Sequence, residues 1–356
     1  MPKTVVVGMS GGVDSSVAAL LLKQQGYDVI GLFMNNWKET DENGCCTAEE
    51  DYTDVRRVCA TIGIPYYTVD FSKEYYDNVF RFFLSEYEHG RTPNPDVLCN
   101  REIKFGAFRK QAEKIGADYI ATGHYCGVLH RNGRTYLTRC ADENKDQTYF
   151  LNQVTEEQIE NVLFPLSDIE DKTLVRKIAA ENGLITATKK DSTGVCFIGE
   201  RNFRKFLSQY IPMKPGEIRT LDGEVVGKHN GVYYYTIGQH KGFGLGGVMG
   251  QKNTAPWYIV KKDVPNNILY VHQGEIPELY TTKLTTDRFN FITEVKNEGD
   301  VLARIRHRQP LQKAHFVRNE DGSVTVTFAE KQRAVTPGQY CVLYDDKIVL
   351  GGGIIQ

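Results

Sequence analysis

The chain has 356 residues, of which 41% are hydrophobic and 25% charged, and its formal net charge is −2. These values are typical of a soluble globular protein, and the length predicts two or three domains. No apolar run reaches the ~20 residues that a membrane span needs, and the N-terminus is typical of a strand rather than a signal segment, so we expect a cytoplasmic protein with no membrane association. The eight cysteines are then expected to be thiols. Because the sequence contains no Cys-x-x-Cys pair, neither zinc nor an iron–sulfur cluster is expected.

The first predicted elements are a strand, Thr4–Gly8, and an amphipathic helix, Val13–Gln25, with a glycine-rich turn between them. Glycines let backbone amides approach an oxyanion, and a helix N-terminus adds N–H groups and a positive dipole end, so this arrangement predicts a phosphate site. The turn lacks the lysine of a Walker A loop and the spacing of a dinucleotide fingerprint. Asp14 is a candidate Mg²⁺ ligand, and a plain glycine turn is the alternative. The whole stretch is Gly8-Met9-Ser10-Gly11-Gly12-Val13-Asp14-Ser15-Ser16.

Strands and helices continue to alternate as far as residue 122. The further strands are predicted at Val29–Phe33, Pro65–Asp70 and Tyr119–Thr122, and the helices at Ala48–Ile62, Lys73–Glu88 and Ile103–Ile115. This alternation predicts an α/β fold with a parallel, Rossmann-like sheet and helices on both faces. Because ligands bind at the carboxyl ends of such strands, the loops after the first, second and fourth strands are expected to converge. Met34 and Gly123, in the second and third of these loops, are candidates to frame a bound nucleotide, although Met34 fits a core position as well.

Two cysteines lie in polar stretches rather than at apolar periodic positions. Cys99 precedes the fourth predicted helix, and a thiol near a helix N-terminus with Arg101 beside it ionises more readily than an ordinary one. Asp96, three residues upstream, is placed to accept or deliver a proton. Cys196 lies in a second polar loop, and for both thiols an inert role is the alternative. Cys59, Cys126, Cys140 and Cys341 are expected to be buried, inert thiols. Cys45 and Cys46 fit either metal binding or chance exposure, and no role is assigned to them.

After Tyr125 the pattern changes from alternating strands and helices to mainly β. A hairpin around Asn132-Gly133 is predicted first, and Tyr233–Tyr235 is predicted as a strand. The helices between them are expected at Glu156–Val162, Thr173–Asn182 and Phe203–Gln209. A small C-terminal barrel is predicted from the strands Val301–His307, Ala314–Arg318, Ser323–Phe328, Tyr340–Tyr344 and Ile348–Leu350. The expected domains are residues 1–210, which hold the phosphate site, 211–275, a central β-rich domain, and 276–356, the barrel.

Charge is unevenly distributed along the chain. Residues 1–100 contain 15 acidic and 8 basic residues, whereas residues 201–262 contain 10 basic and 3 acidic ones. A basic segment in a nearly neutral chain favours a polyanionic partner. In the predicted strand 301–307, extended to Arg308, a period of two places Arg304, Arg306 and Arg308 on one face and His307 on the other. Phosphate binding accounts for both features, and a solvated basic surface is the alternative.

The sequence Ser-Gly-Gly-Val-Asp-Ser at residues 10–15 resembles the PP-loop of the N-type ATP pyrophosphatases. With further motifs included, the chain resembles the bacterial tRNA-specific 2-thiouridylases (the MnmA family) over its whole length and departs from them at no motif position. These motifs are Asn94-Pro95-Asp96-Val97-Leu98-Cys99-Asn100, Gly123-His124-Tyr125, Lys145-Asp146-Gln147, Gly194-Val195-Cys196-Phe197-Ile198-Gly199, Tyr235-Thr236-Ile237-Gly238-Gln239-His240-Lys241-Gly242 and Thr336-Pro337-Gly338-Gln339.

The resemblance implies ATP- and Mg²⁺-dependent 2-thiolation of the wobble uridine in tRNAs for Lys, Glu and Gln. Adenylation of the uridine C2 oxygen would release pyrophosphate, and sulfur would then replace that oxygen, giving 2-thiouridine and AMP. The ATP site implied is residues 8–15 with Met34 and Gly123. The resemblance makes Cys196 the persulfide carrier, charged by a relay protein or a cysteine desulfurase, and Cys99 a nucleophile able to form a disulfide with Cys196. It assigns the target base to Asn94, Pro95 and Asp96, with Asp96 as general acid/base, and tRNA contacts to His124, Lys145, Asp146, Gln147, Arg306, His307 and Gln339.

Two other functions are compatible with the phosphate loop. The same loop occurs in synthetases that adenylate a small metabolite, but that function leaves both loop cysteines and the two β-rich domains unused. A tRNA-binding protein that holds ATP as a structural ligand is the second alternative. It predicts that tRNA is fully modified when Asp14 is replaced, whereas the enzymatic interpretation predicts loss of AMP release.

Overall fold

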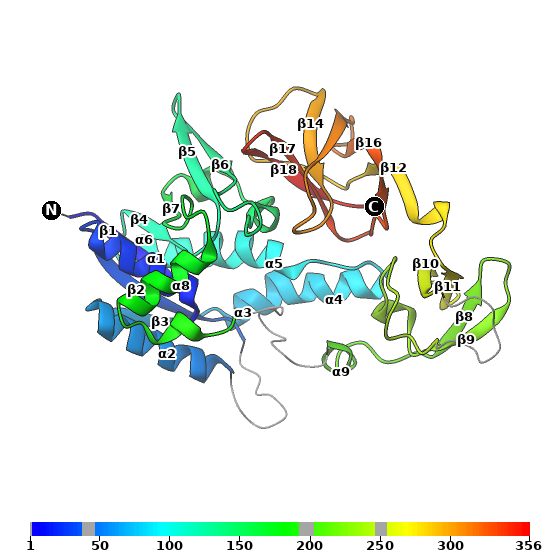
Figure 1. The fold of residues 1–356 in the computed structure, drawn as a ribbon, viewed down its shortest axis with the longest axis horizontal. Coiled ribbons are helices and arrows are strands. Elements are labelled where there is room, and N and C mark those ends of the chain that lie inside the picture. Colours follow the sequence, from blue (N-terminus) through cyan, green and yellow to red (C-terminus); the bar gives the residue numbers. More distant parts are fainter. Residues whose placement is uncertain (1, 38–46, 192–202, 246–254) are drawn as a thin grey trace.

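The structure is a computed structural model that describes residues 2–37, 47–191, 203–245 and 255–356. Its first part is built on a five-stranded parallel sheet with the strand order β3-β2-β1-β4-β7 (Figure 1). The strands are β1 (Thr4–Met9), β2 (Asp28–Asn35), β3 (Tyr66–Asp70), β4 (Tyr119–Ala121) and β7 (Val162–Leu163). The predicted α/β class and the first four strands are confirmed. The fifth strand was predicted as the end of a helix, but that helix, α7 (Glu156–Ile159), ends before Val162.

Alternation along β1 explains why both faces of this sheet are covered. Val5 and Val7 belong to one core cluster and Val6 to another, because successive side chains of a strand point to opposite faces. Helices α1 (Val13–Gln24), α2 (Thr47–Ile62) and α8 (Lys172–Glu181) contribute their buried side chains to the first cluster. The second cluster receives its side chains from two long helical segments that lie on the opposite face.

The two long helical segments each contain a stretch of π-helix. The first runs from α3 (Ser72–Tyr75) through η1 (Tyr76–Phe80) to α4 (Arg81–Glu88), close to the predicted bounds. The second runs from α5 (Pro95–Leu98) through η2 (Cys99–Ala107) to α6 (Phe108–Lys114). The prediction that this helix starts at Ile103 is wrong. Pro95 takes the first helical position, where its missing N–H costs nothing, and Asn94 before it is extended at φ −119°.

The predicted hairpin around Asn132-Gly133 is confirmed as β5 (Gly127–Arg131) and β6 (Arg134–Thr138). It joins the C-terminal sheet, because Thr138 pairs with Ile348 of β18. That sheet has the order β12-β16-β15-β14-β17-β18-β6-β5, with β13 paired to β18. Its other strands are β12 (Tyr280–Thr285), β13 (Asn290–Phe291), β14 (Glu298–Arg304), β15 (Gln312–Arg318), β16 (Val324–Arg333), β17 (Tyr340–Asp345) and β18 (Ile348–Ile354). The sheet therefore unites residues on both sides of the predicted limit at 210.

A four-stranded sheet of order β10-β11-β8-β9 forms the central part of the chain. Its strands are β8 (Gly216–Thr220), β9 (Val225–His229), β10 (Trp257–Asp263) and β11 (Ile268–Gln273). The strand predicted at Tyr233–Tyr235 is wrong: Val232–Tyr234 is a 3-10 helix, η5, entered through Gly231 at φ +140°. The remaining short helices are η3 (Thr148–Leu151), η4 (Ile185–Thr188), α9 (Phe203–Leu207) and η6 (Pro277–Leu279).

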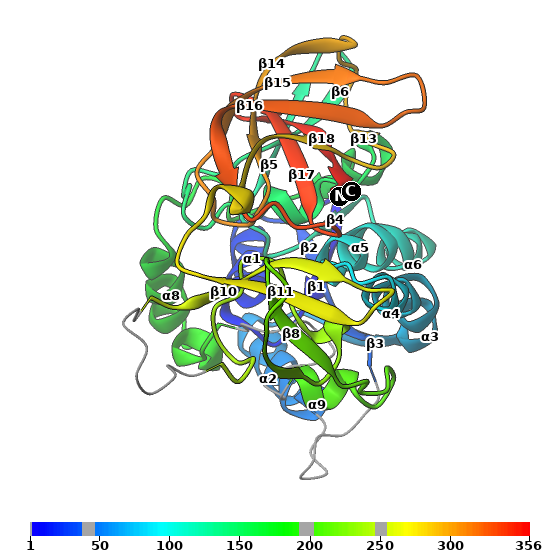
Figure 2. The same cartoon turned by 90° about the vertical axis from the view of Figure 1, so that its right-hand side faces the viewer.

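Buried side chains from all three parts of the chain belong to one hydrophobic cluster. Figure 2 shows the ribbons of the central sheet and the C-terminal sheet, one below the other. The same cluster of buried side chains contains Phe80 from the first part, Ile218 from the central sheet and Tyr340 from the C-terminal sheet. The segment after α4 lies at the junction, where the Thr92 amide donates to the Pro337 carbonyl at 2.9 Å. In the described part of the chain, no helix is long and apolar enough to cross a membrane.

Candidate active site

The glycine-rich turn after β1 presents the N-terminus of α1 at the carboxyl edge of the parallel sheet. Gly12 is the N-cap residue, and no side chain within the described residues caps the helix. Its first-turn amides are thus available to a ligand. The Ser15 hydroxyl donates to the Gly12 carbonyl at 3.1 Å and accepts from the Ser10 amide at 3.2 Å. Gly11 has φ +74°, and a Cβ there would lie 2.8 Å from the Asp51 backbone, so the turn requires glycine at this position.

The loops after β1 and β4 converge, as predicted, and the end of β2 lies beside them. A Cβ on Gly123 would lie 2.7 Å from the Asp14 carbonyl carbon and the Ser15 nitrogen, so only glycine allows this close approach. The Tyr125 hydroxyl donates to Asp14 Oδ1 at 2.8 Å. Met34, expected in the second loop, lies instead near the end of β2, with its Cε 3.2 Å from where a Cβ of Gly8 would lie. The β4 loop and the end of β2 therefore both lie against the phosphate loop.

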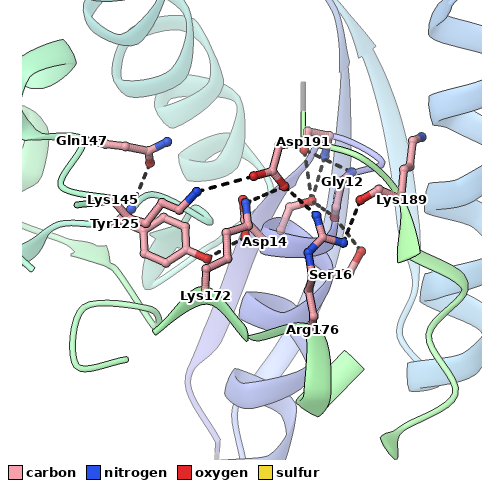
Figure 3. A network of polar contacts seen from close by, with 12 residues as sticks. Gly12, Asp14, Ser16, Tyr125, Lys145, Gln147, Lys172, Arg176, Lys189 and Asp191 are labelled. Atoms are coloured by element: carbon pink, nitrogen blue, oxygen red, sulfur yellow. Dashed lines mark hydrogen bonds and ion pairs between the residues drawn. The ribbon is translucent and has the colours of Figure 1, made fainter. Parts of the chain in front are cut away.

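A network of charged side chains surrounds Asp14, and sequence reasoning missed most of it (Figure 3). Lys172, the first residue of α8, places its Nζ 2.9 Å from Asp14 Oδ2 and 2.7 Å from Asp191 Oδ1. Burial, followed by the charge of Asp14 and its hydrogen bond, raises the pKa of Tyr125, so this phenol stays protonated and donates. No local sequence signal connects Lys172 to a loop 158 residues away.

Cys99 lies inside the second helical segment and is fully buried, so the expected polar, helix-start environment is wrong. Asp96, one turn earlier, is half-buried. Phe108 of the same segment lies 3.6 Å from a Cβ position on Gly8, so this helix packs directly against the phosphate loop. Cys196 and its expected disulfide with Cys99 fall outside the described residues, as do Cys45 and Cys46.

A cleft of about 480 Å³ opens where the three parts of the chain meet, next to the start of α5. Its lining residues are Thr92, Thr236, Ile237, Gly238, Gln239, Arg306, Thr336 and Gln339. The Gln339 amide donates to the Thr92 carbonyl at 2.7 Å, two residues before Asn94. Two of the predicted tRNA contacts, Arg306 and Gln339, thus border the segment predicted to face the target base.

The predicted arginine face of residues 301–308 is wrong. β14 ends at Arg304, and Arg308 has φ +64°, so the alternation of a strand does not continue beyond Arg304. Arg304 is 2% exposed, and its Nη2 donates to Asp146 Oδ2 at 2.6 Å. Asp146 itself is 1% exposed and also accepts from Arg139 Nε at 3.2 Å. This buried ion pair joins the segment just before η3 to the C-terminal sheet, and neither member presents its charge to solvent.

The remaining predicted tRNA contacts lie in different environments. Lys145 keeps 30% of its side chain exposed and lies 3.7 Å from Asp191, whereas Gln147 accepts from the Tyr125 amide at 2.9 Å. Burial lowers the pKa of His124 well below its usual value, with Lys104 adding to the effect. Burial, followed by the charges of Arg308 and Arg304, lowers the pKa of His307 to about 4. Both imidazoles are therefore neutral near pH 7.

The fold and this site define a class of protein, a PP-loop nucleotide-binding domain joined to two β-rich domains. Three family models match in agreement with this: "tRNA methyl transferase HUP domain" over residues 3–200, "tRNA methyl transferase PRC-barrel domain" over 204–273 and "Aminomethyltransferase beta-barrel domain" over 281–355. The "tRNA-specific 2-thiouridylase MnmA" of Bacillus subtilis is 57% identical over 99% of this chain and 94% of its own length. The protein of the same name from Staphylococcus aureus is 55% identical over 99% and 95%. The chain belongs to the tRNA-specific 2-thiouridylase family.

The similarity to solved structures is much lower than the similarity to these sequence relatives. The "U34-tRNA thiolase NcsA from Methanococcus maripaludis with its [4Fe-4S] cluster" covers 58% of this chain and 64% of that one, at 19% identity and a TM-score of 0.37. In the described part of this chain, no group of three or more His, Cys, Asp or Glu side chains is arranged to hold a metal ion.

Proposed function

We propose that this chain uses ATP to convert the wobble uridine of tRNA to 2-thiouridine, with AMP and pyrophosphate as the other products. The observation that carries the proposal is the contact between the phosphate loop and the helical segment that begins at Asn94, where Phe108 lies 3.6 Å from a Cβ position on Gly8. The segment that reaches the phosphate loop through Phe108 also carries the carboxylate of Asp96 and the thiol of Cys99. Membership of the 2-thiouridylase family supports the assignment of tRNA as the substrate.

In the first step, the uridine C2 oxygen attacks the α-phosphorus of ATP, and the bond to the β-phosphate breaks. The first-turn amides of α1 and the Ser10 and Ser15 hydroxyls stabilise the charge on the departing pyrophosphate. Met34 and Gly123 lie against the adenosine, and Asn94, Pro95 and Asp96 hold the uridine, which must leave its stack to react. The oxygen is now part of AMP, which is a far better leaving group than an oxide.

In the second step, sulfur replaces the activated oxygen. The terminal sulfur of a persulfide on Cys196, or hydrosulfide freed from it, attacks C2, and AMP leaves with the C2 oxygen. In the persulfide route, the Cys99 thiolate then attacks the Cys196 sulfur, which breaks the S–S bond, frees 2-thiouridine and forms a Cys99–Cys196 disulfide. An external thiol reduces this disulfide for the next cycle. Asp96 acts as general acid/base and accepts or delivers the proton that moves in these steps.

Mg²⁺ fits the donor set at the start of α1, because Asp14 supplies one carboxylate and the ion takes its other ligands from phosphates and water. When bound, it offsets negative charge between the phosphates. Asp14 is paired with Lys172 in the structure, so a bound ion would compete with this lysine for the carboxylate.

We assign the tRNA surface to the cleft at the three-part junction and its surroundings. Arg306 and Gln339 line this cleft. Lys145 and His307 are two further proposed tRNA contacts. The basic segment 201–262, which contains part of the central sheet, attracts the phosphate backbone of the tRNA. Asp146 supports this surface by holding Arg304. Gln147 accepts from the Tyr125 amide, and His124 contacts Thr122 and Lys104.

The Cys196→Ser variant tests the proposal, with ATP, a persulfide donor and tRNA present. We expect 2-thiouridine, measured by mass spectrometry of digested tRNA, to fall to background, because serine cannot carry a persulfide. AMP bound to tRNA as an adenylate should still form, since the ATP site is untouched. Unchanged 2-thiouridine would contradict the role of Cys196. The matched control is Cys59→Ser, which alters a buried thiol on α2 away from the proposed chemistry.

A further inference from the structure

The network around Asp14 contains a lysine to which the proposed chemistry assigns no role. Lys172 Nζ lies within 2.9 Å of Asp14 and 2.7 Å of Asp191, and its side chain is only 11% exposed. The ring of Tyr125 lies 5.7 Å from the same nitrogen. Two carboxylates and an aromatic ring thus hold Lys172 beside Asp14 in the first turn of α1 (Figure 3).

Cations outnumber carboxylates around Asp14 and Asp191. Asp191 is shared by Lys172, by Arg176 at 2.8 Å and by Lys145 at 3.7 Å, so three cations face two carboxylates. Although burial opposes it, these cations hold the pKa of Asp191 below its usual value. The positive dipole end of α1 adds to the excess. The excess is confined to the side of Lys172, because beside Gly11 the two carboxylates of Asp51 and Asp54 share the one cation of Lys189.

Arg176 links Asp191 to the backbone of the neighbouring segment 187–189. Its Nη1 donates to the carbonyls of Ala187 and Lys189 at 2.8 Å each, and its Nη2 donates to Asp191. Arg176 is thus committed to the backbone of residues 187–189. Lys172, by contrast, has carboxylate partners alone among the polar contacts described for it and a flexible four-carbon stem, so it can exchange one oxygen partner for another.

We propose that Lys172 binds the pyrophosphate portion of ATP, taking a phosphate oxygen in place of Asp14 when the nucleotide enters. Asp14 would otherwise repel the polyphosphate beside it, and the exchange frees its carboxylate for Mg²⁺. Asp191 is a positioning residue that keeps Lys172 at the loop throughout. This lysine supplies from α8 the cation that a Walker A loop carries within itself. The inference rests on the proposed ATP site and assigns its pyrophosphate side.

Equilibrium binding by calorimetry tests the inference without any turnover. For Lys172→Ala, we expect the Kd of ATP and of pyrophosphate to rise by about tenfold or more, and the Kd of AMP to stay within about twofold, since AMP lacks the two outer phosphates. Lys172→Arg should recover part of the ATP affinity, because the charge is kept. Lys177→Ala is the matched control: it removes the same charge from the exposed side of α8, where Lys177 pairs with Glu181 at 3.8 Å.

Each remaining result decides between two claims. If the wild-type chain binds no ATP, the proposed function itself fails. If the wild type binds ATP and Lys172→Ala binds it equally well, only the assignment of Lys172 is wrong. An equal loss of AMP and ATP affinity would also overturn it, since Lys172 would then support the whole site rather than the pyrophosphate. The same loss in Lys177→Ala would show a general effect of net charge.

Discussion

Single residues that look alike in the sequence have very different roles in the structure. Asp146 and Lys145 are neighbours in one motif, yet Lys145 reaches solvent whereas Asp146 is buried between Arg304 and Arg139. The sequence could not separate them, because burial of Asp146 depends on strand β14, which lies more than 150 residues away. Arg304 was wrongly assigned to an exposed arginine face for the same reason. A strand pattern shows which side chains lie on the same face of a strand, but it does not show whether another part of the chain covers that face.

The Asp146–Arg304 pair gives a prediction about stability. Asp146→Ala leaves Arg304 buried without its carboxylate, and breaking such a pair costs about 3–5 kcal/mol. We expect a clear fall in the Tm measured by differential scanning calorimetry. The double variant Asp146→Ala/Arg304→Met should lose less than the two single variants added together. An unchanged Tm in Asp146→Ala would contradict a structural role and favour a direct contact with tRNA.

A second residue-scale prediction concerns pH. The folded-state pKa of His307 is about 4, below its usual value of about 6.5. The unfolded chain therefore takes up this proton first, so stability decreases as the pH falls from about 6.5 towards 4. We expect His307→Gln, which cannot titrate, to make the Tm less sensitive to pH between 7 and 5. The same pH dependence in variant and wild type would show that His307 is not protonated on unfolding in this range.

At the scale of elements, the sequence predicted those helices, strands and loops whose signals are contiguous along the chain, and it missed elements that lack such a local pattern. The phosphate loop was found because its glycines, hydroxyls and flanking strand and helix are contiguous in the sequence. The start of α5 was missed because the predicted helix begins only at Ile103, although Pro95 suits the first helical position. Strand β7 was missed because two residues, Val162 and Leu163, carry no periodicity.

The close approach of the β4 loop to α1 gives an element-scale prediction. In Gly123→Ala, the added methyl group would meet the Asp14–Ser15 backbone at 2.7 Å, so one of the two elements must move. We expect ATP affinity, measured by calorimetry, to fall by about tenfold or more. Gly299→Ala on β14 is the control, because its nearest new contact is an ordinary 3.6 Å to Phe316. Equal ATP affinity in the two variants would show that the close contact between the β4 loop and the start of α1 is not needed for ATP binding.

At the scale of the whole molecule, the parts are more interwoven than the sequence indicated. The predicted division at residues 210 and 275 follows changes in pattern, yet the β5–β6 hairpin of the first part completes the C-terminal sheet. Such pairing depends on long-range hydrogen bonds such as that from the Arg139 amide to the Lys347 carbonyl at 2.9 Å, which no local pattern encodes. The consequence is that the segment before Asn94 is positioned by both β-rich parts, through Pro337, Gln339 and Thr236.

This arrangement predicts that a change in the C-terminal sheet alters the tRNA reaction without altering ATP binding. A Cβ on Gly338 would lie 2.8 Å from the Thr92 nitrogen, so Gly338→Ala should displace the segment that leads to Asn94. We expect slower formation of 2-thiouridine at an unchanged Kd for ATP. Gly322→Ala has a similar positive φ but open space around it, and it controls for backbone strain alone. Equal rates in both variants would rule out the coupling.

The most direct test of the central claim follows the oxygen that leaves the base. A tRNA carrying ¹⁸O at C2 of the wobble uridine is incubated with the protein, ATP, Mg²⁺ and a persulfide donor, and the products are analysed by mass spectrometry. If the C2 oxygen is adenylated before sulfur replaces it, the ¹⁸O appears in AMP, with one AMP and one pyrophosphate for each 2-thiouridine. If the ¹⁸O appears in water or inorganic phosphate, or if 2-thiouridine forms without AMP, the proposed mechanism is wrong.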